Sequence, residues 1–302
     1  MSRVLICGAH GFIGSHLRRA LAARGHQVVS GQSAPTRAGD DAAMQVDFVS
    51  DVTVDAWRPR LKGIDVVVNA VGVLRDSARR PIVAIHETVP KALFDACAQA
   101  GVARVVQVSA LGIEASGTDY ARTKRAADAH LQALVAAGRL DAAIVRPSIV
   151  FGRGGASSEL FLNLARLPLL LMPGPVLRAR VQPVAVVELA EVLAGLVESP
   201  GAVSEFAAQP LAAVGPEPVG MAHFIASLRA QAGRGRAGVA ALPAAITALS
   251  ARFGDAIPAS PWCSETLAML GTDNVAEPAR FASRLGRPAT AYGRLLLDGP
   301  AR

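Results

Sequence analysis

Three glycines close to the N-terminus constrain the fold of this chain more than any other feature. They occupy positions 8, 11 and 14, directly after an apolar run at residues 4–7 and at the start of a stretch with helical spacing. In a strand-turn-helix unit, the first glycine permits the tight turn, the second lets backbone amides approach a pyrophosphate, and the third lets the helix lie close to the sheet. The helix N-terminus adds its own preference for an anion. The loop therefore predicts a dinucleotide site that includes Gly8, His10, Gly11, Phe12, Ile13 and Gly14.

The first 150 residues alternate short β-branched runs with longer stretches rich in Ala and Leu, which is typical of β-α units in a parallel sheet. We expect an α/β fold with a Rossmann-like doubly wound parallel sheet, in which residues 1–150 form the dinucleotide-binding core. The predicted strands are 3–7, 27–30, 44–46, 64–69, 104–109 and 142–146. The predicted helices between them are 12–24, 54–61, 81–100 and 119–137.

The second half of the chain, residues 151–302, has loops rich in Gly and Pro between apolar helices. We expect it to form a small C-terminal cap on the substrate side, interleaved with the end of the sheet. Segment 160–177 is unusually rich in Leu. Core packing is its first interpretation, and the alternatives are a pocket wall for an apolar compound such as a quinone or lipid, or contact with a membrane surface. The helices predicted here are 160–167, 186–198, 221–232, 240–251 and 264–270.

Composition and charge exclude several classes of protein. With 51% hydrophobic and 18% charged residues the chain can bury a large core, and no uninterrupted apolar run is long enough to predict a transmembrane helix. The 31 basic and 24 acidic residues give a net charge of +7, but the surplus is spread evenly along the sequence, so we expect no nucleic-acid partner. Three widely spaced cysteines predict neither disulfides nor a metal site. Without a signal-peptide pattern, the expected location is the cytoplasm.

The end of the second predicted strand bears on which dinucleotide is bound. A fold that prefers NAD usually presents a carboxylate there for the adenosine ribose. Here the sequence has Gln32 between two serines, with Arg37 following, so NADP(H) is favoured and NAD(H) is the alternative. Asp47 could accept a hydrogen bond from the adenine amino group. The end of the fourth strand is expected beside the cofactor, and it supplies Asn69, Ala70, Val71 and Gly72.

Tyr120 and Lys124 form the second chemical signal, because residues four apart project from the same face of a helix. A phenol by itself has a pKa near 10. A nearby ammonium stabilises the phenolate, so the pair could exchange a proton with a carbonyl or an alcohol close to neutral pH. Lys124 could also bind the nicotinamide ribose.

In combination, these motifs resemble the short-chain dehydrogenase/reductase superfamily, in particular its extended and atypical members. The resemblance rests on the glycine loop, the 69–72 strand end, the Ser109–Gly112 segment, the Tyr120/Lys124 pair and Arg146-Pro147-Ser148, which occur in the family's order. It covers roughly residues 3–200. The pattern is most similar to the atypical group resembling the NADPH-binding accessory subunit of respiratory complex I, often labelled NAD-dependent epimerase/dehydratase.

The resemblance implies roles for individual residues. Tyr120 would be the acid/base, Lys124 its ribose-binding partner, and Ser109 the hydroxyl nearest the substrate carbonyl, while Pro147 and Ser148 would lie against the nicotinamide. The eleven-residue separation of Ser109 and Tyr120 is shorter than in nucleotide-sugar enzymes of the family. Two hydroxyls in the shortened loop are substitutes for Ser109, or caps of the following helix: Ser116 and Thr118. His10 and His86 have no partner defined by the sequence, and a structural role is preferred for both.

We therefore expect an NAD(P)(H)-binding oxidoreductase that acts on a carbonyl or alcohol by hydride transfer, with Tyr120 as the acid/base. The expected partner is a small-molecule substrate, and an apolar compound is one option. One alternative is a nucleotide-sugar epimerase or dehydratase. Another is a non-catalytic NADPH-binding accessory or assembly protein for respiratory complex I or quinone biosynthesis, associated with a membrane surface or a protein complex. The sequence leaves the oligomeric state open.

Overall fold

A computed structural model describes residues 1–34, 42–199, 201–255 and 264–297. Its centre is a seven-stranded sheet in the order β11-β6-β5-β4-β1-β2-β3, and every neighbouring pair is parallel. This order reverses at β1, as in doubly wound folds, so the predicted fold class is confirmed. The strands are β1 (Arg3–Cys7), β2 (Gln27–Gln32), β3 (Ala43–Gln45), β4 (Val66–Asn69), β5 (Arg104–Val108), β6 (Asp141–Pro147) and β11 (Leu211–Ala213).

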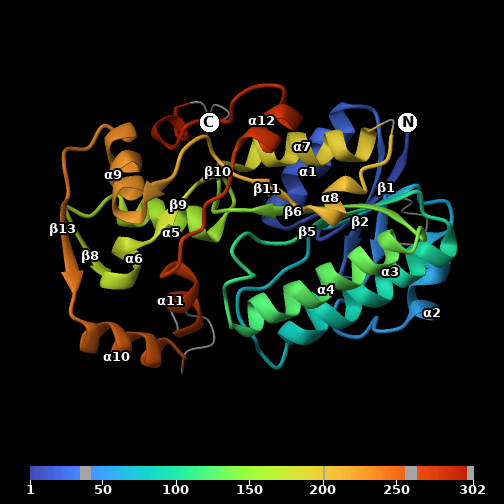
Figure 1. Cartoon of the computed structure of the whole chain (residues 1–302), viewed down its shortest axis with the longest axis horizontal. Helices are drawn as coiled ribbons and strands as arrows, with labels where there is room; N and C mark the ends of the chain where they lie inside the picture. The colour runs from blue at the N-terminus through green and yellow to red at the C-terminus, as the bar shows by residue number, and fades with distance from the viewer. Residues whose placement is uncertain (35–41, 200, 256–263, 298–302) are drawn as a thin grey trace.

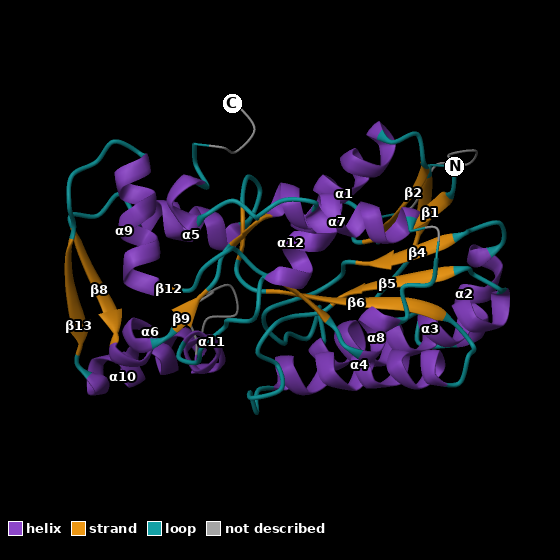
Figure 2. Cartoon of the chain, turned by 45° about the horizontal axis from the view of Figure 1, so that its top comes forward, coloured by secondary structure: helices purple, strands orange, loops and turns teal. Residues whose placement is uncertain are grey.

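Helices cover both faces of this sheet (Figures 1 and 2). One face carries α1 (Phe12–Ala23), α7 (Val186–Glu198) and α12 (Ala279–Leu285). The opposite face carries α2 (Val54–Trp57) with the 3₁₀ turn η1 (Arg58–Leu61), the π-helical turn η2 (Ala84–Thr88) with α3 (Val89–Ala100), and α4 (Asp119–Ala136). The short helix α8 (Glu205–Ala208) contacts α4 and β6.

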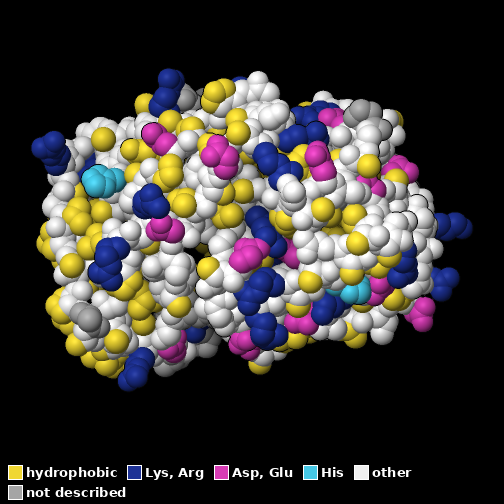
Figure 3. Space-filling view, viewed as in Figure 1, with side chains coloured by type: hydrophobic (Ala, Val, Ile, Leu, Met, Phe, Trp, Pro, Cys, Tyr) yellow, Lys and Arg dark blue, Asp and Glu magenta, His cyan; other side chains and the backbone are white. Residues whose placement is uncertain are grey.

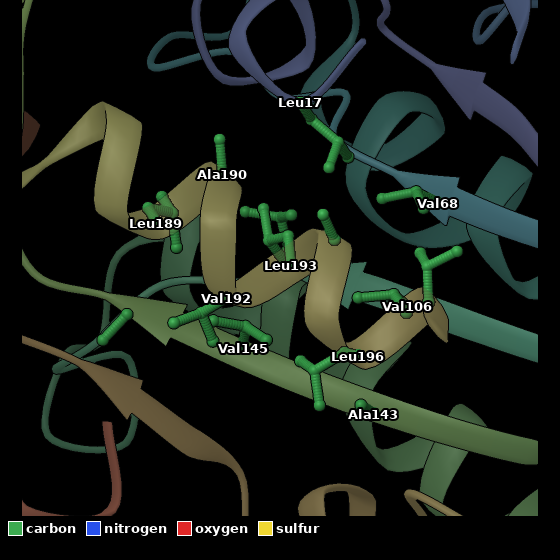
Figure 4. Packing of buried hydrophobic residues seen from close by; sticks show 14 of the residues in the cluster. Leu17, Val68, Val106, Ala143, Val145, Leu189, Ala190, Val192, Leu193 and Leu196 are labelled. Atoms are coloured by element: carbon green, nitrogen blue, oxygen red, sulfur yellow. The ribbon is translucent and has the colours of Figure 1, made fainter. Parts of the chain in front are cut away.

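The strands bury both faces, which explains why their sequences read as continuous apolar runs. In β1, Val4 and Ile6 join the core beneath α1 and α7, whereas Leu5 and Cys7 join the core beneath α3 and α4. Figure 4 shows the first of these cores, where leucines of α7 pack on valines of the central strands. Each such leucine contributes about 1.5–3 kcal/mol by leaving water.

The cap lies at one end of the sheet and has its own apolar core around Phe161, Leu170 and Phe224 (Figure 1). Its helices are α5 (Ala156–Leu164), α6 (Gly174–Arg178), α9 (Met221–Gln231), α10 (Ala244–Asp255) and α11 (Ser264–Leu270), and η3 (Tyr292–Arg294) is a 3₁₀ turn. Its strands form three pairs: β7 (Val150–Phe151) with β10 (Val184–Ala185), β9 (Arg180–Val181) with β12 (Val219–Gly220), and β8 (Leu169–Pro173) with β13 (Gly238–Leu242).

One local prediction for the second half is wrong. The helix predicted at 240–251 begins only at Ala244, because residues 238–242 pair with β8 as strand β13. The leucine-rich segment 160–177 is a helix, a strand and a further helix, and its strand buries Leu170 while leaving Leu169 half-exposed. Two elements that the sequence patterns did not predict, β11 and α12, return to the main sheet. No helix in the described ranges is both long and apolar enough to cross a bilayer.

Candidate functional site

The glycine loop is closed in a way that only glycine permits. Gly8 has φ +83°, and a Cβ there would lie 3.1 Å from the carbonyl of Ala70 in the neighbouring loop. At Gly14, a Cβ would stand 2.1 Å from the carbonyl oxygen of Gly8. Gly11 is the N-cap residue of α1, and because glycine has no side chain it forms no capping hydrogen bond with the first amides of the helix. The loop is therefore a cradle that side chains would fill, and the first amides of α1 can bind a phosphate. His10 in this loop is exposed.

The two described residues that directly follow β2 include no carboxylate. The strand ends at Gln32, and Ser33 and Ala34 follow. The predicted phosphate partner Arg37 lies outside the described residues. Within residues 27–34, this end of the strand offers no acid to repel a 2′-phosphate.

Two polar residues predicted to face the cofactor also have structural partners. Asp47 accepts a hydrogen bond from Ser50 Oγ at 2.7 Å and shapes the turn after β3. Asn69 is buried, donates to Gln107 Oε1 at 2.8 Å, and accepts from the Val71 N–H at 3.2 Å. These bonds hold the loops at the carboxyl edge of the sheet, and contact of either side chain with a cofactor stays a prediction.

Tyr120 and Lys124 lie together on α4 at the same edge of the sheet. Lys124 is buried, its Nζ donates to the Val108 carbonyl at 3.2 Å, and a Cβ at Gly72 would stand 3.6 Å from it. Burial lowers the pKa of Lys124 to about 8, although Asp128 opposes the shift. Burial raises the pKa of Tyr120 to about 12, and Asp128 adds to this effect. At neutral pH the phenol is protonated and most Lys124 side chains are charged.

Ser109, the third predicted catalytic residue, is buried and donates its hydroxyl to Asp128 Oδ2 at 2.8 Å. The same carboxylate oxygen accepts from Arg146 Nε at 3.1 Å and Nη2 at 2.9 Å. Burial raises the pKa of Asp128, while Arg146 and the Ser109 hydrogen bond oppose the shift. The serine hydroxyl is thus held by α4, and its contact with a substrate stays a prediction.

His86 lies beneath the Tyr120 ring, with the two rings edge to face and their centroids 5.1 Å apart. Its Nε2 accepts from the Val73 N–H at 2.9 Å, which places the imidazole hydrogen on Nδ1, 3.3 Å from Thr123 Oγ1. Burial first, and Lys124 second, lower the pKa of His86 to about 2. The expectation of a hydrogen-bonded structural histidine is confirmed, and this histidine supports the Tyr120 ring. The π-helical turn η2 supplies it, as such turns often do at functional sites.

The two alternative hydroxyls lie together at the start of α4. Thr118 is the N-cap of α4, and its Oγ1 accepts from the Ala121 N–H at 3.2 Å. Ser116 lies 3.0 Å from that hydroxyl, oxygen to oxygen. The capping interpretation therefore accounts for Thr118. Ser116 lines a cavity beside Tyr120, and its role as a substitute for Ser109 stays a prediction.

A small cavity of about 30 Å³ lies against Tyr120, with Leu111 on one side and Asn274 from the C-terminal segment on the other. Asn274 donates from Nδ2 to the Leu111 carbonyl at 2.9 Å. Its Oδ1 is buried without a hydrogen-bond partner among the described residues. Ser148 donates to the Asn274 carbonyl at 3.0 Å, so this predicted nicotinamide contact also ties the C-terminal segment to the sheet. Pro147, at the end of β6, is buried.

A larger hollow of about 620 Å³ lies between α1, α7 and the loop after β7, where His16, Arg153 and Val186 line it. It shares no lining residue with the cavity beside Tyr120. We place the candidate site at Tyr120, because the titratable pair and the glycine loop meet at that edge of the sheet.

Comparison with known proteins agrees with this geometry. A model of the NAD dependent epimerase/dehydratase family matches residues 4–171, more than half of the chain. The chain belongs to this family. The resemblance inferred from the sequence motifs is thereby confirmed, and a nicotinamide cofactor and a function among the NAD(P)-binding oxidoreductases and epimerases are supported.

Relatives that match about half of this chain are named for different activities. The chain is 32% identical over 176 residues to a ceramide reductase of Caulobacter vibrioides, which covers 55% of this chain and 52% of that protein. It is 25% identical over 186 residues to a UDP-glucose 4-epimerase of Vibrio cholerae, covering 54% and 56%. The chain thus matches only about half the length of these relatives.

A solved structure shows the same fold over nearly the whole chain. The NADPH-dependent quinone oxidoreductase QOR2 of Escherichia coli, complexed with NADPH, superposes with a TM-score of 0.69 at 16% identity, covering 96% of this chain and 97% of that one.

Sequence reasoning missed two residues of this site. Asp128 continues the Tyr120 and Lys124 spacing by one more helical turn, so the periodicity of α4 could have indicated it. Asn274 has no local signal, because it reaches the site from a loop more than a hundred residues away along the chain.

Proposed function

We propose that this protein is an NADP(H)-dependent oxidoreductase that reduces the carbonyl group of an apolar substrate, or oxidises the corresponding alcohol. The observation that carries the proposal is the pair of half-buried Tyr120 and buried Lys124 at the sheet edge next to the glycine loop. The ceramide reductase relative supports an apolar substrate.

The residues present fit a dinucleotide. The cradle at Gly8, Gly11 and Gly14 would hold the pyrophosphate, Gln32 and Ser33 at the end of β2 would accept a 2′-phosphate, and Lys124 would bind the nicotinamide ribose. The bound nicotinamide supplies the hydride in reduction or accepts it in oxidation.

The protein's own contribution is the proton. In reduction, Tyr120 donates its phenolic hydrogen to the carbonyl oxygen, so that the hydride and this proton together convert the carbonyl to an alcohol. The raised pKa keeps the donor protonated at neutral pH. The Lys124 ammonium stabilises the phenolate that remains, and a proton from solvent restores the phenol.

The test combines cofactor binding with turnover. Fluorescence titration should show tighter binding of NADPH than of NADH, and a panel of long-chain ketones and quinones should oxidise NADPH. Tyr120→Phe should lower kcat/KM about 10²–10⁴-fold. Tyr292, the only other tyrosine in the chain, provides the matched control, since Tyr292→Phe should leave the rate unchanged.

Other outcomes would overturn the proposal in distinct ways. Turnover of UDP-sugars without net NADPH consumption would indicate an epimerase. Retained NADPH with no turnover of any carbonyl, together with a co-purifying partner, would indicate an accessory protein.

A further inference from the structure

The distal end of the cap has a one-sided charge distribution. We call this end the cap pole and define it as residues 160–180 and 219–254, which contain β8, α6, α9, β13 and most of α10. The first stretch contains three arginines and the second contains four, and neither contains an Asp or a Glu. Figures 1 and 2 both place these elements together at the end of the molecule away from the main sheet. The charge surplus that is even along the sequence is therefore concentrated in space.

Helix α10 packs on the protein through its small residues, whereas a core helix packs through its large apolar side chains. Small residues of this helix face the protein, since Thr247 and Ala251 are 5% and 1% exposed. Its large apolar side chains face outward, with Ile246, Leu249 and Phe253 exposed by 53%, 58% and 66%. Their spacing of three and four residues puts them on one stripe. A helix stripe of this kind normally packs on an apolar core. Its exposure therefore indicates that it packs on an apolar partner outside this chain.

The β8–β13 pair carries further exposed apolar side chains at the same end of the molecule (Figure 1). Leu169 and Leu171 alternate with the buried Leu170 and Met172, and they are half-exposed at 49% and 54%. Figure 3 shows the corresponding left-hand end of the molecule, where hydrophobic side chains predominate with basic side chains among them.

Basic side chains lie at the other end of β13 from α10 (Figure 1). A hollow of about 800 Å³ between α9 and β13 has His223, Arg234 and Arg236 on its lining. Both arginines are exposed, and neither forms an ion pair with a carboxylate in the described part of the chain. In contrast, Arg180 at the edge of the cap pole pairs with Asp273 at 2.9 Å. The charges of Arg234 and Arg236 are therefore available for an anionic partner.

We propose that the cap pole docks on an anionic lipid bilayer, with the α10 stripe inserted among the headgroups and acyl chains and the arginines on the lipid phosphates. Protruding apolar side chains flanked by Arg are the composition of interfacial membrane contacts. A nucleic acid would match the arginines but leave the leucines and the phenylalanine in water. The proposal rests on surface chemistry and does not depend on the reaction proposed above.

One contact links the docking helix to the candidate site. Arg75, in the loop that follows Gly72, donates from Nη1 to the Gly254 carbonyl at 3.1 Å and from Nη2 to the Asp255 carbonyl at 3.3 Å. The C-terminal end of α10 is thus held beside the loop that borders Lys124. If the proposed function holds, this arrangement would let an apolar substrate reach the site from the bilayer.

The experiment is flotation of the full chain with vesicles of phosphatidylcholine, alone or mixed with phosphatidylglycerol. The wild-type protein should float with the mixed vesicles, bind neutral vesicles more weakly, and lose affinity as salt rises. The variant Ile246→Ser/Leu249→Ser/Phe253→Ser should lose at least about tenfold in partition coefficient. The matched control is Val49→Ser/Val52→Ser, which removes apolar side chains that are 39% and 42% exposed on the Rossmann core, and it should bind as the wild type does.

A second pair of variants tests the charge. Arg234→Gln/Arg236→Gln should weaken binding to the mixed vesicles about fivefold per arginine, whereas Arg139→Gln, an exposed arginine on the core, should not. Unchanged thermal midpoints would show that the variants fold. Three results would overturn the proposal. They are no flotation of the wild type with mixed vesicles, flotation of the α10 variant equal to that of the wild type, or binding of the wild type to DNA through Arg234 and Arg236 without binding to vesicles. Each can be distinguished from failure of the proposed function, because none requires a cofactor or turnover.

Discussion

The hydroxyl of Ser109 and the carboxylate of Asp128 are joined by a buried hydrogen bond of 2.8 Å between β5 and α4. Arg146 reaches the same carboxylate from β6 at 2.9 Å. A strand-end serine, a helix carboxylate and a neighbouring strand's arginine thus fix the position of the helix that carries Tyr120 and Lys124.

Asp128→Ala should destabilise the protein by about 3 kcal/mol, because it leaves the largely buried Arg146 without its interior partner. Arg146 also pairs with Glu114, whose side chain is 55% exposed, so Glu114→Ala is a matched control that should cost less than about 1 kcal/mol. Urea denaturation measures both changes. Equal losses from the two variants would contradict a special role for the buried partner.

Lys124→Met should stabilise the protein while removing its activity. Burial lowers the pKa of Lys124 from 10.5 to about 8. Below pH 8 the ammonium is charged in both the folded and the unfolded state, but only the folded state buries this charge, at a cost in free energy. Replacing it should raise the free energy of unfolding by about 2 kcal/mol at pH 7. The gain should shrink as pH rises from 8 and vanish above about 10.5, where both states hold a neutral amine. A stability difference that stays constant across this range would show that the charge is not the cause.

Two helical glycines should respond in opposite directions to alanine. Gly14→Ala places a Cβ 2.1 Å from the Gly8 carbonyl oxygen, so the loop must move, at a cost of about 3 kcal/mol or more. Gly195→Ala, in α7, meets no atom within 4 Å and should stabilise the helix by about 0.5–1 kcal/mol. Thermal unfolding compares the two variants, and NADPH titration should show loss of binding only in the first. Normal NADPH affinity in Gly14→Ala would mean that the close approach is not needed for the cofactor.

His86 should keep a single neutral tautomer across the physiological range, because its pKa is lowered to about 2. The Val73 N–H occupies Nε2, so nitrogen-detected NMR should show the hydrogen on Nδ1 from pH 5 to pH 8, with no titration. The exposed His10 in the glycine loop is the internal comparison. A midpoint near the ordinary value for His86 would overturn this assignment.

The sequence determined the core of the fold because its signals are local. The Gly8–Gly14 spacing is set by one turn, and the strand and helix periods of the first 150 residues can be read within windows of ten to twenty residues. The same reasoning found Tyr120 and Lys124, which lie one helical turn apart on a single element. The weak predictions fell in the cap, where residues 238–242 became a strand only because β8 lies beside them.

Contacts between segments that are distant in the sequence form only through tertiary packing. Asn274 reaches Leu111, and Arg75 holds the end of α10, through contacts that span more than 150 residues of sequence. The cap pole shows the same effect for charge, since two acid-free stretches that are separated along the chain become one surface when the cap folds. Periodicity and composition describe neighbours along the chain, whereas packing of the apolar faces sets which distant segments meet.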